Sequence, residues 1–171
     1  DKYESGQFTL NLENHSIQEL AYSSIVSIES LIEAKHLLTK VEGDDFSVVV
    51  DADRLTQALV NILSNAVKFS PEGGTIKITT KRRNKDVLLE VADQGPGIPD
   101  SYKAYVFERF KQVESEAQKH KGTGLGLPIA KQVVEAHEGQ IGVRDNEGGG
   151  TVFWFTVPME TAHGKEDAGA S

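Results

Sequence analysis

The sequence contains no cysteine, and it has one tryptophan and one methionine among its 171 residues. Without cysteine the chain forms no disulfide and no thiolate metal site, so nothing in it indicates an oxidising compartment. It also lacks an apolar run near the roughly 18 residues of a membrane-spanning helix, and its start, DKYESGQ, does not resemble a signal peptide. We therefore expect a cytoplasmic location, which leaves open whether the parent protein is anchored in a membrane.

Positive charge is also scarce. The chain has 18 lysine and arginine residues against 26 aspartate and glutamate residues, a net charge of −8. Such a domain is repelled by phosphate backbones and by anionic lipid surfaces, so we expect neither nucleic acid nor a membrane as a direct partner. The length and the 38% hydrophobic content are typical of one compact globular domain, and we therefore expect one active site.

Three segments have the apolar spacing of long helices. The first, over about 16–36, begins with a capping box formed by Ser16 and Glu19. The second begins after Asp51 or Asp53, either of which can cap it, and ends near 69 before the breaker cluster SPEGG. The third covers about 125–138, with a proline tolerated in its first turn and Gly139 at its end.

Alternating or β-branched segments between these helices predict strands. They cover about 8–14, 37–42, 47–51, 75–83, 86–93, 140–145 and 150–157. The fourth and fifth should form an antiparallel hairpin that turns at Asn84 and Lys85, and a short helix is expected near 101–106. This order indicates an α+β fold with helices layered on one face of a mixed sheet. Residues 161–171 have too little apolar content to join the core, so we expect a disordered tail.

The second helix carries an unusual polar stripe. Gln57, Asn61, Asn65 and Lys68 are three or four residues apart and therefore lie on one face. Asparagine is a mediocre helix former, and its amide oxygen suits a hard cation such as Mg²⁺ that is bound jointly with nucleotide phosphates. A lysine on the same face adds positive charge toward those phosphates. The alternative is an ordinary solvent-exposed face.

Two glycine-rich segments suggest ligand contacts. Asp93-Gln94-Gly95-Pro96-Gly97-Ile98 directly follows a strand, where glycine lets a flat ring approach the backbone and a carboxylate can accept from an exocyclic amine. An ordinary β-turn explains that segment equally well. The segment 122–127, GTGLGL, leads into a helix whose free N–H groups favour an anion, although a ligand-free hinge is an alternative. It has neither the order of a P-loop nor the preceding buried strand of a dinucleotide fingerprint.

Together and in this order, these segments resemble the conserved boxes of histidine kinases, within the wider GHKL family that includes gyrase, Hsp90 and MutL-type ATPases. The resemblance covers about 8–158. The boxes are the N box NILSNAVKF at 61–69, the G1 box DQGPGI at 93–98, the F box FERF at 107–110 and the G2 box GTGLGL at 122–127. The sequences VFERF and GGGTVFWFTVP favour the histidine-kinase branch. The resemblance implies a Bergerat fold, a two-layer α/β sandwich with a mixed, mostly antiparallel sheet covered on one face by three long helices.

The resemblance also implies roles for individual residues. Asn61 would bind Mg²⁺, Asn65 and Lys68 would contact the phosphates of ATP, and Phe69 would lie against the nucleotide. Asp93 would accept from the adenine amine, in a pocket shaped by Gly95, Gly97 and Ile98, with Thr151 as a further candidate there. The segment 111–124 would be a lid over ATP, and the phosphates would meet Gly122, Thr123, Gly124, Leu125 and Gly126.

One position differs from the hydrolytic relatives, and another departs from the pattern of many histidine kinases. Hydrolytic relatives have a glutamate base one turn before the Mg²⁺-binding asparagine, where this chain has Gln57, so we expect slow hydrolysis of ATP. Many histidine kinases have an arginine at the position of Gln112 that meets the γ-phosphate. Arg109, Lys111, Lys119 or Lys121 could substitute, although surface solubility explains each of the four equally well. With Asn61 and Lys68, the residues expected to act in catalysis are Arg109 and Lys111.

The phosphoacceptor is expected elsewhere, because none of the histidines at 15, 36, 120, 137 and 163 lies in an HExxxP-like setting. Residues 1–7 resemble the end of a dimerisation helix that would carry this acceptor and address a response regulator, and 8–160 would form the catalytic domain. Because that helical pair makes the dimer, we expect this fragment to be monomeric. A hydrolytic ATPase and a non-catalytic nucleotide-binding docking module are the alternatives.

Overall fold

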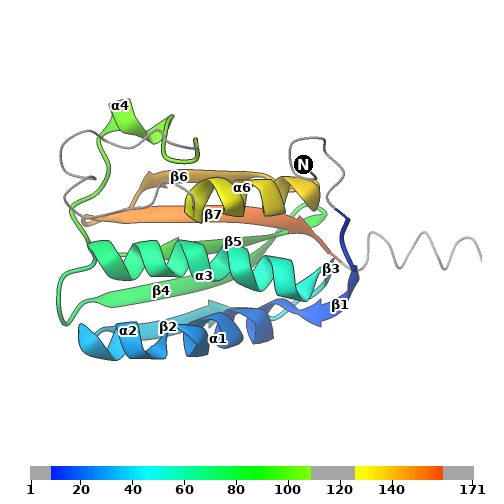
Figure 1. Cartoon of the computed structure of the whole chain (residues 1–171), viewed down its shortest axis with the longest axis horizontal. Helices are drawn as coiled ribbons and strands as arrows, with labels where there is room; N and C mark the ends of the chain where they lie inside the picture. Colours follow the sequence, from blue (N-terminus) through cyan, green and yellow to red (C-terminus); the bar gives the residue numbers. More distant parts are fainter. Residues whose placement is uncertain (1–8, 109–125, 160–171) are drawn as a thin grey trace, which may run out of the picture.

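The protein folds into two layers, with helices on one side and a twisted sheet on the other (Figure 1). The computed structural model describes residues 9–108 and 126–159. Helices α1 (Ile17–Ser27), α2 (Glu29–Ala34), α3 (Ala52–Phe69) and α6 (Gly126–Ala136) lie along one face of the sheet, with α3 in the middle. The short helix α4 (Asp100–Lys103) stands apart at one end. The predicted two-layer α+β fold is confirmed.

The main sheet has five strands in the described residues, in the order β2-β4-β5-β7-β6. Their bounds are Leu38–Gly43 for β2, Thr75–Arg83 for β4, Asp86–Ala92 for β5, Ile141–Asp145 for β6 and Thr151–Pro158 for β7. β2 pairs with β4 in parallel, and the other three pairs are antiparallel. The sheet is therefore mixed and mostly antiparallel, and β4 and β5 form the predicted hairpin with Asn84 in the left-handed region at φ 59°.

The first and third strands form a separate small sheet, which the sequence did not indicate. β1 (Glu13–Ser16) runs antiparallel to β3 (Ser47–Val50), and a bridge between Val48 and Met159 links this pair to the chain just after β7. The strand predicted over 8–14 is wrong in its bounds, because within the described residues the segment pairs with β3 only over Glu13–Ser16. Backbone pairing between distant segments decides such a short strand, and local alternation cannot show it.

The predicted first long helix is two helices. Ser16 caps α1 as expected, with its hydroxyl oxygen accepting from the Glu19 N–H at 3.1 Å. At Ile28 the backbone leaves the helical region (φ −118°, ψ 25°), and the Ile28 N–H bonds to the carbonyl of Ile25. Ile28 is 5% exposed, so the break turns this side chain inward and lets α1 and α2 both follow the core. The apolar spacing continues through the break, which explains why it could not be predicted.

Helix α3 provides the centre of the core. Its buried face packs against side chains of β4, β5 and β7, and the largest fully buried members of this cluster are Leu55, Leu59, Ile62, Leu63, Ile76, Ile78, Leu89, Phe153 and Phe155. Burying each such side chain stabilises the fold by roughly 1.5–3 kcal/mol. No helix in the described part of the chain is both long and apolar enough to cross a membrane.

The start of α3 is fixed by Asp51, as one of the two predicted caps. Its carboxylate accepts from the backbone N–H of Arg54 at 3.1 Å and of Asn11 at 2.9 Å. Burial acts to raise the pKa of Asp51, but these hydrogen bonds and the nearby Arg54 charge outweigh it and hold the pKa below its usual value. The backbone N–H of Asp51 donates in turn to Nε2 of His137 at 3.0 Å.

His137 has a structural role. The side chain is 4% exposed, and its Nδ1 lies 2.8 Å from the Val133 carbonyl, which makes Nδ1–H the donor. Both ring nitrogens are therefore used by a neutral imidazole. Gly139 follows at the end of α6, but the left-handed residue there is Glu138 at φ 64°. Gly139 is needed for close approach, because a Cβ would come within 1.9 Å of the Thr156 carbonyl oxygen.

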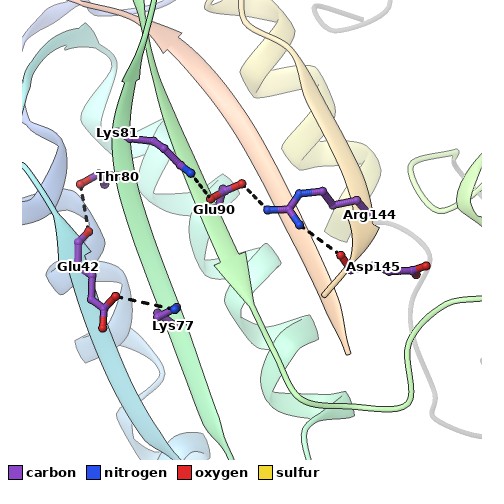
Figure 2. Close-up of polar contacts among 7 residues, drawn as sticks. All are labelled: Glu42, Lys77, Thr80, Lys81, Glu90, Arg144 and Asp145. Atoms are coloured by element: carbon purple, nitrogen blue, oxygen red, sulfur yellow. Dashed lines mark hydrogen bonds and ion pairs between the residues drawn. The ribbon is translucent and has the colours of Figure 1, made fainter. Parts of the chain in front are cut away.

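The face of the sheet opposite the helices is covered by paired charges (Figure 2). Glu90 lies 3.4 Å from the Lys81 ammonium and 2.7 Å from the Arg144 guanidinium, which reaches it from β6. Burial acts to raise the pKa of Glu90, but the Arg144 hydrogen bond and the two cationic charges outweigh it and lower the pKa. Lys77 and Glu42 form a more exposed pair at 3.8 Å. This charged face also holds Val152 and Trp154, the strand partners of Arg144 and Glu90, but the main core cluster lies on the helix side.

The burial of His137 predicts a pH dependence of stability. Burial lowers the pKa of His137 against the effects of the Val133 hydrogen bond and the Asp51 charge. Its contribution is then complete above the unfolded-state pKa near 6.5 and is lost as the pH falls toward the lower folded-state pKa. We expect the free energy of unfolding to decrease between pH 7.5 and 5.5, by at most about 1.4 kcal/mol per pH unit from this residue.

Urea denaturation of three proteins at both pH values checks this. In His137→Gln the decrease should be smaller than in the wild type, and in the control His36→Gln, which alters an exposed histidine, it should match the wild type. An equal decrease in His137→Gln and the wild type would show that the imidazole does not carry the effect.

Candidate functional site

Most of the predicted site residues that the structure describes lie at one end of the sheet. There the carboxyl end of α3, the end of β5 and the start of β7 lie close together (left in Figure 1). At the ends of helices and strands, backbone N–H and C=O groups are left without regular partners. Such an end can bind a ligand while the packed interior of the domain stays rigid.

The Asp93 side chain is buried and firmly fixed at this end. It is 3% exposed, and its Oδ1 accepts from the backbone N–H of Gly95 at 2.9 Å and of Thr151 at 3.1 Å. Its backbone N–H donates to the Thr151 carbonyl, and its own carbonyl accepts from the Asn146 side-chain amide, both at 2.9 Å. Within the described residues no hydrogen bond uses Oδ2. The carboxylate is therefore held in one orientation with one oxygen left for a ligand.

The environment of Asp93 changes its acidity. Burial raises the pKa of Asp93, and the two N–H donors, which act in the opposite direction, do not cancel the effect. A buried carboxylate held in this way at the end of a strand is a poor contributor to stability, since its charge is only partly compensated. Perturbed carboxyl groups of this kind are concentrated at functional sites.

Two glycines around Asp93 are required by close backbone contacts. A Cβ on Gly150, which has φ 110°, would come within 2.0 Å of the Asp93 carbonyl oxygen. A Cβ on Gly95 would come within 2.4 Å of the Phe69 carbonyl oxygen at the end of α3. Gly97 differs, because it needs glycine for its φ of 87° and not for space. The segment after β5 is therefore pressed directly against the last turn of α3.

Asn61 connects α3 to the start of α6. Its Nδ2 donates to the Gly126 carbonyl at 3.1 Å, which directs the amide so that Oδ1 is left as an acceptor; no hydrogen bond in the described residues uses that oxygen. An amide oxygen in this position fits a Mg²⁺ ligand. Residues 9–108 and 126–159 contain no group of three histidine or acidic side chains that could hold a metal, so phosphate oxygens and water would have to complete the coordination.

The rest of the α3 stripe is half-buried, except for its first member. Asn65 and Lys68 are partly buried and Gln57 is exposed. Burial lowers the pKa of Lys68, whose ammonium lies 5.8 Å from the centre of the Phe69 ring. From Asn61 to Phe69 the helix rises about 12 Å, at 1.5 Å per residue. This distance is suited to an extended ligand with a base at one end and phosphates at the other.

The segment that follows Gly97 is held in place by contacts of Ile98 with the core and with Lys103. Ile98 is partly buried against the core cluster, and its carbonyl accepts from the Lys103 ammonium at 2.7 Å. The same ammonium lies 3.0 Å from the Asp145 carboxylate at the end of β6. Phe107, the first phenylalanine of the F box, packs edge-on against Phe153 with ring centres 6.1 Å apart. The F box thus begins as part of the hydrophobic core.

Several predicted site residues lie outside the described residues. These are Arg109, Lys111, Gly122, Thr123, Gly124 and Leu125, together with Gln112, Lys119 and Lys121. Their predicted roles stay predictions, as does the lid over 111–124. Of the predicted set, Asp93, Gly95 and Thr151 are joined by hydrogen bonds, Gly95 also touches Phe69, and Asn61 is bonded to Gly126.

Sequence reasoning missed three residues that build this end. Asn146, read as part of a linking turn, bonds to the Asp93 carbonyl, and Gln94 accepts from the Thr75 N–H at 2.9 Å. Lys35, near the end of the first predicted helix, bonds to the end of α3. Asn146 could have been noticed as an asparagine two residues before a run of three glycines, but the other two contacts depend on long-range packing.

This chain is similar in sequence to known ATPases and histidine kinases. The family model described as histidine kinase-, DNA gyrase B- and HSP90-like ATPase matches residues 50–161. The chain is 38% identical over 165 residues to the sensor histidine kinase WalK of Bacillus subtilis, covering 93% of this chain and 27% of that protein. It spans between 11% and 32% of the length of the curated relatives it matches.

Solved structures agree in fold. The nucleotide-free catalytic domain of histidine kinase ThkA superposes with a TM-score of 0.78 at 30% identity, covering 88% of this chain and 97% of that domain. ThkA bound to the response regulator protein TrrA gives 0.76 at 27% identity, covering 94% of this chain and 46% of that one. This chain therefore belongs to the histidine kinase-, DNA gyrase B- and HSP90-like ATPase family, and within it to the catalytic domains of sensor histidine kinases.

Proposed function

We propose that this domain binds Mg-ATP and donates the γ-phosphate to a histidine on an upstream dimerisation domain, which passes it to a response regulator. The observation that carries the proposal is the Asp93 carboxylate, which is buried, oriented by two N–H donors and left with one oxygen for a ligand. The proposal that a response regulator is the final acceptor rests on the similarity to ThkA, which has been solved in complex with the response regulator protein TrrA. The dimer would be formed by that dimerisation domain, so the catalytic domain by itself would be monomeric.

The adenine end of the site would lie at Asp93. A carboxylate oxygen accepts from the exocyclic amine of adenine, and a guanine carbonyl at the same place would face an acceptor with an acceptor. The backbone of Gly95 and Gly97 lets the flat ring come close, and Ile98 can cover it. Thr151 supports this pocket mainly through its backbone N–H, which holds Asp93.

The phosphate end would lie along α3 toward Asn61. Oδ1 of Asn61 would bind Mg²⁺, which supplies charge neutralisation of the phosphates when it is present. Asn65 and Lys68 follow on the same helix face, and a lysine with a pKa lowered by burial gains from an anionic partner. Gly126 at the start of α6 adds the N-terminal end of a helix, which favours anions.

Transfer to a protein acceptor is favoured over hydrolysis by Gln57. It occupies the α3 position one turn before Asn61, and a glutamine side chain cannot remove a proton from water near neutral pH. Catalysis then depends on positioning and on neutralisation of the phosphate charge by Mg²⁺ and by cations, for which Lys68, Arg109 and Lys111 are the candidates. A steady hydrolytic ATPase and a docking module without transfer are the alternatives that the experiments below separate.

Nucleotide binding is tested first, by calorimetry with a non-hydrolysable ATP analogue with and without Mg²⁺. Asp93→Asn replaces an acceptor oxygen by a donor in a buried site, so we expect a loss of about 2 kcal/mol, or roughly 30-fold in Kd, both with and without Mg²⁺. Asn61→Ala should mainly remove the gain in affinity that Mg²⁺ gives. Asp100→Asn is the matched control, since this carboxylate is exposed and lies seven residues further along.

The affinities can be compared only if all three variants keep the melting temperature of a folded domain. If the wild type shows no binding at millimolar analogue, the boxes do not form a nucleotide site and the proposal fails. Equal losses in Asp93→Asn and Asp100→Asn would place the adenine elsewhere.

Phosphoryl transfer is tested by adding the histidine-containing dimerisation domain of a related sensor kinase together with labelled Mg-ATP. We expect label on that domain and little free phosphate, and no label when its histidine is replaced by glutamine. Steady release of phosphate that is lost in Asn61→Ala would instead establish the hydrolytic alternative. Nucleotide binding without either product would establish the docking module.

A further inference from the structure

Lys35 makes three hydrogen bonds to the end of α3 from a part of the chain more than thirty residues away. It lies just after α2, and its ammonium donates to the carbonyl oxygens of Val67 at 2.8 Å, Lys68 at 2.8 Å and Ser70 at 2.7 Å. An ammonium group has three N–H donors, so these contacts use all of them. The side chain therefore has one fixed position and does not simply lie on the surface.

These contacts are favourable because they lie at the carboxyl end of a helix. The last carbonyl groups of a helix have no partners within the helix, and they carry the negative end of its dipole. A cation that bonds to three carbonyl oxygens in and just beyond the last turn satisfies them and neutralises that end. Lys35 thus acts as a C-terminal cap supplied by a different helix.

The capped turn is also part of the proposed nucleotide site. It presents Lys68 and Phe69, and the Phe69 carbonyl is the group against which Gly95 is pressed, where a Cβ would come within 2.4 Å. Gly95 in turn donates its N–H to Asp93. A small rotation of this last turn would move Gly95 and with it the orientation of the Asp93 carboxylate, because there is no free space between them.

The backbone beside Lys35 holds the next segment in the same way. Its carbonyl accepts from the Gly73 N–H, and the Leu38 N–H donates to the Gly74 carbonyl, both at 2.9 Å. Thr75 follows directly, and its N–H donates to the Gln94 side chain beside Asp93. The corner between α2 and β2 is therefore connected to the G1 box through two independent routes, both of which begin at Lys35 or its neighbours.

We propose that Lys35 is a positioning residue for nucleotide binding, which fixes the last turn of α3 and through it the loop that carries Asp93. The inference rests on the proposed nucleotide site and adds a residue that does not touch the ligand. All three donors of the Lys35 ammonium are bonded to carbonyl groups, so its effect reaches the nucleotide through the position of Phe69 and Gly95. Because these residues lie at the adenine end, the loss of Lys35 should weaken the binding of adenosine, which has no phosphates.

The test compares Lys35→Met, Lys35→Arg and Ser16→Ala in the whole chain. Lys35→Met keeps the length of the side chain and removes all three donors, so we expect about tenfold weaker binding of both adenosine and the ATP analogue. Lys35→Arg retains a cation that can donate to carbonyls and should recover most of the affinity. Ser16→Ala is the control, because it also removes a helix cap but lies at α1, away from the site.

Amide hydrogen exchange without nucleotide gives an independent readout. Lys35→Met should speed exchange at Ser70 and Gly95, whose N–H groups bond to Ala66 and Asp93, while Ser16→Ala should leave both unchanged. If Lys35→Met does not fold, Lys35→Gln replaces it, since the amide keeps two donors without the charge.

The outcomes separate this inference from the proposed function. Wild-type affinity in Lys35→Met, in a wild type that does bind the analogue, overturns the positioning role and leaves the nucleotide site standing. A loss of affinity that Ser16→Ala reproduces would mean that general destabilisation is the cause, and it also overturns the role. If the wild type binds neither ligand, both proposals fall together.

Discussion

Helix α3 is the element on which the rest of the structure depends, and side chains from other parts of the chain fix both of its ends. At its start, the Asp51 carboxylate caps the helix and also accepts from the N–H of Asn11. The N–H of Asp51 donates to His137, which directly follows α6. At its end, Lys35 bonds to three carbonyl groups. A helix fixed at both ends and buried along its middle cannot slide, so its polar face is presented at a constant height relative to the sheet.

This constraint explains why the site forms at one end of the domain. The segment after β5 meets the end of α3 in a close backbone contact at Gly95, and the start of β7 meets the end of β5 in another at Gly150. Asp93 then receives two N–H donors that no regular strand would give it. The cost of burying a carboxylate is accepted where function requires an oriented acceptor, and the domain offsets it with the core between helices and sheet.

The sequence allowed good prediction where the determinants are local. The hairpin at Asn84, the bounds of α3 and the cap at Ser16 follow from turn residues, caps and periodicity within short windows. The break at Ile28 was missed because the apolar spacing does not change there, and the β1–β3 pair because it depends on a distant partner. In the site, the ordered boxes predicted Asp93 and Asn61 by type and position. They could not show that Asn146 bonds to the Asp93 carbonyl or that Lys35 bonds to the end of α3, since such contacts arise only from the folded chain.

The histidines further limit how this domain can act. His137 uses both ring nitrogens in buried hydrogen bonds, to the Asp51 N–H and the Val133 carbonyl, and burial keeps it neutral by lowering its pKa. It has no nitrogen left to attack a phosphate, and freeing one would undo the contact that aligns α3. His15 and His36 lie on the surface in or beside β1 and α2, where their acidic neighbours Glu13 and Glu72 would repel a phosphate. None of the histidines in the described residues is therefore a good acceptor, which agrees with the proposed transfer of phosphate to a histidine on another domain.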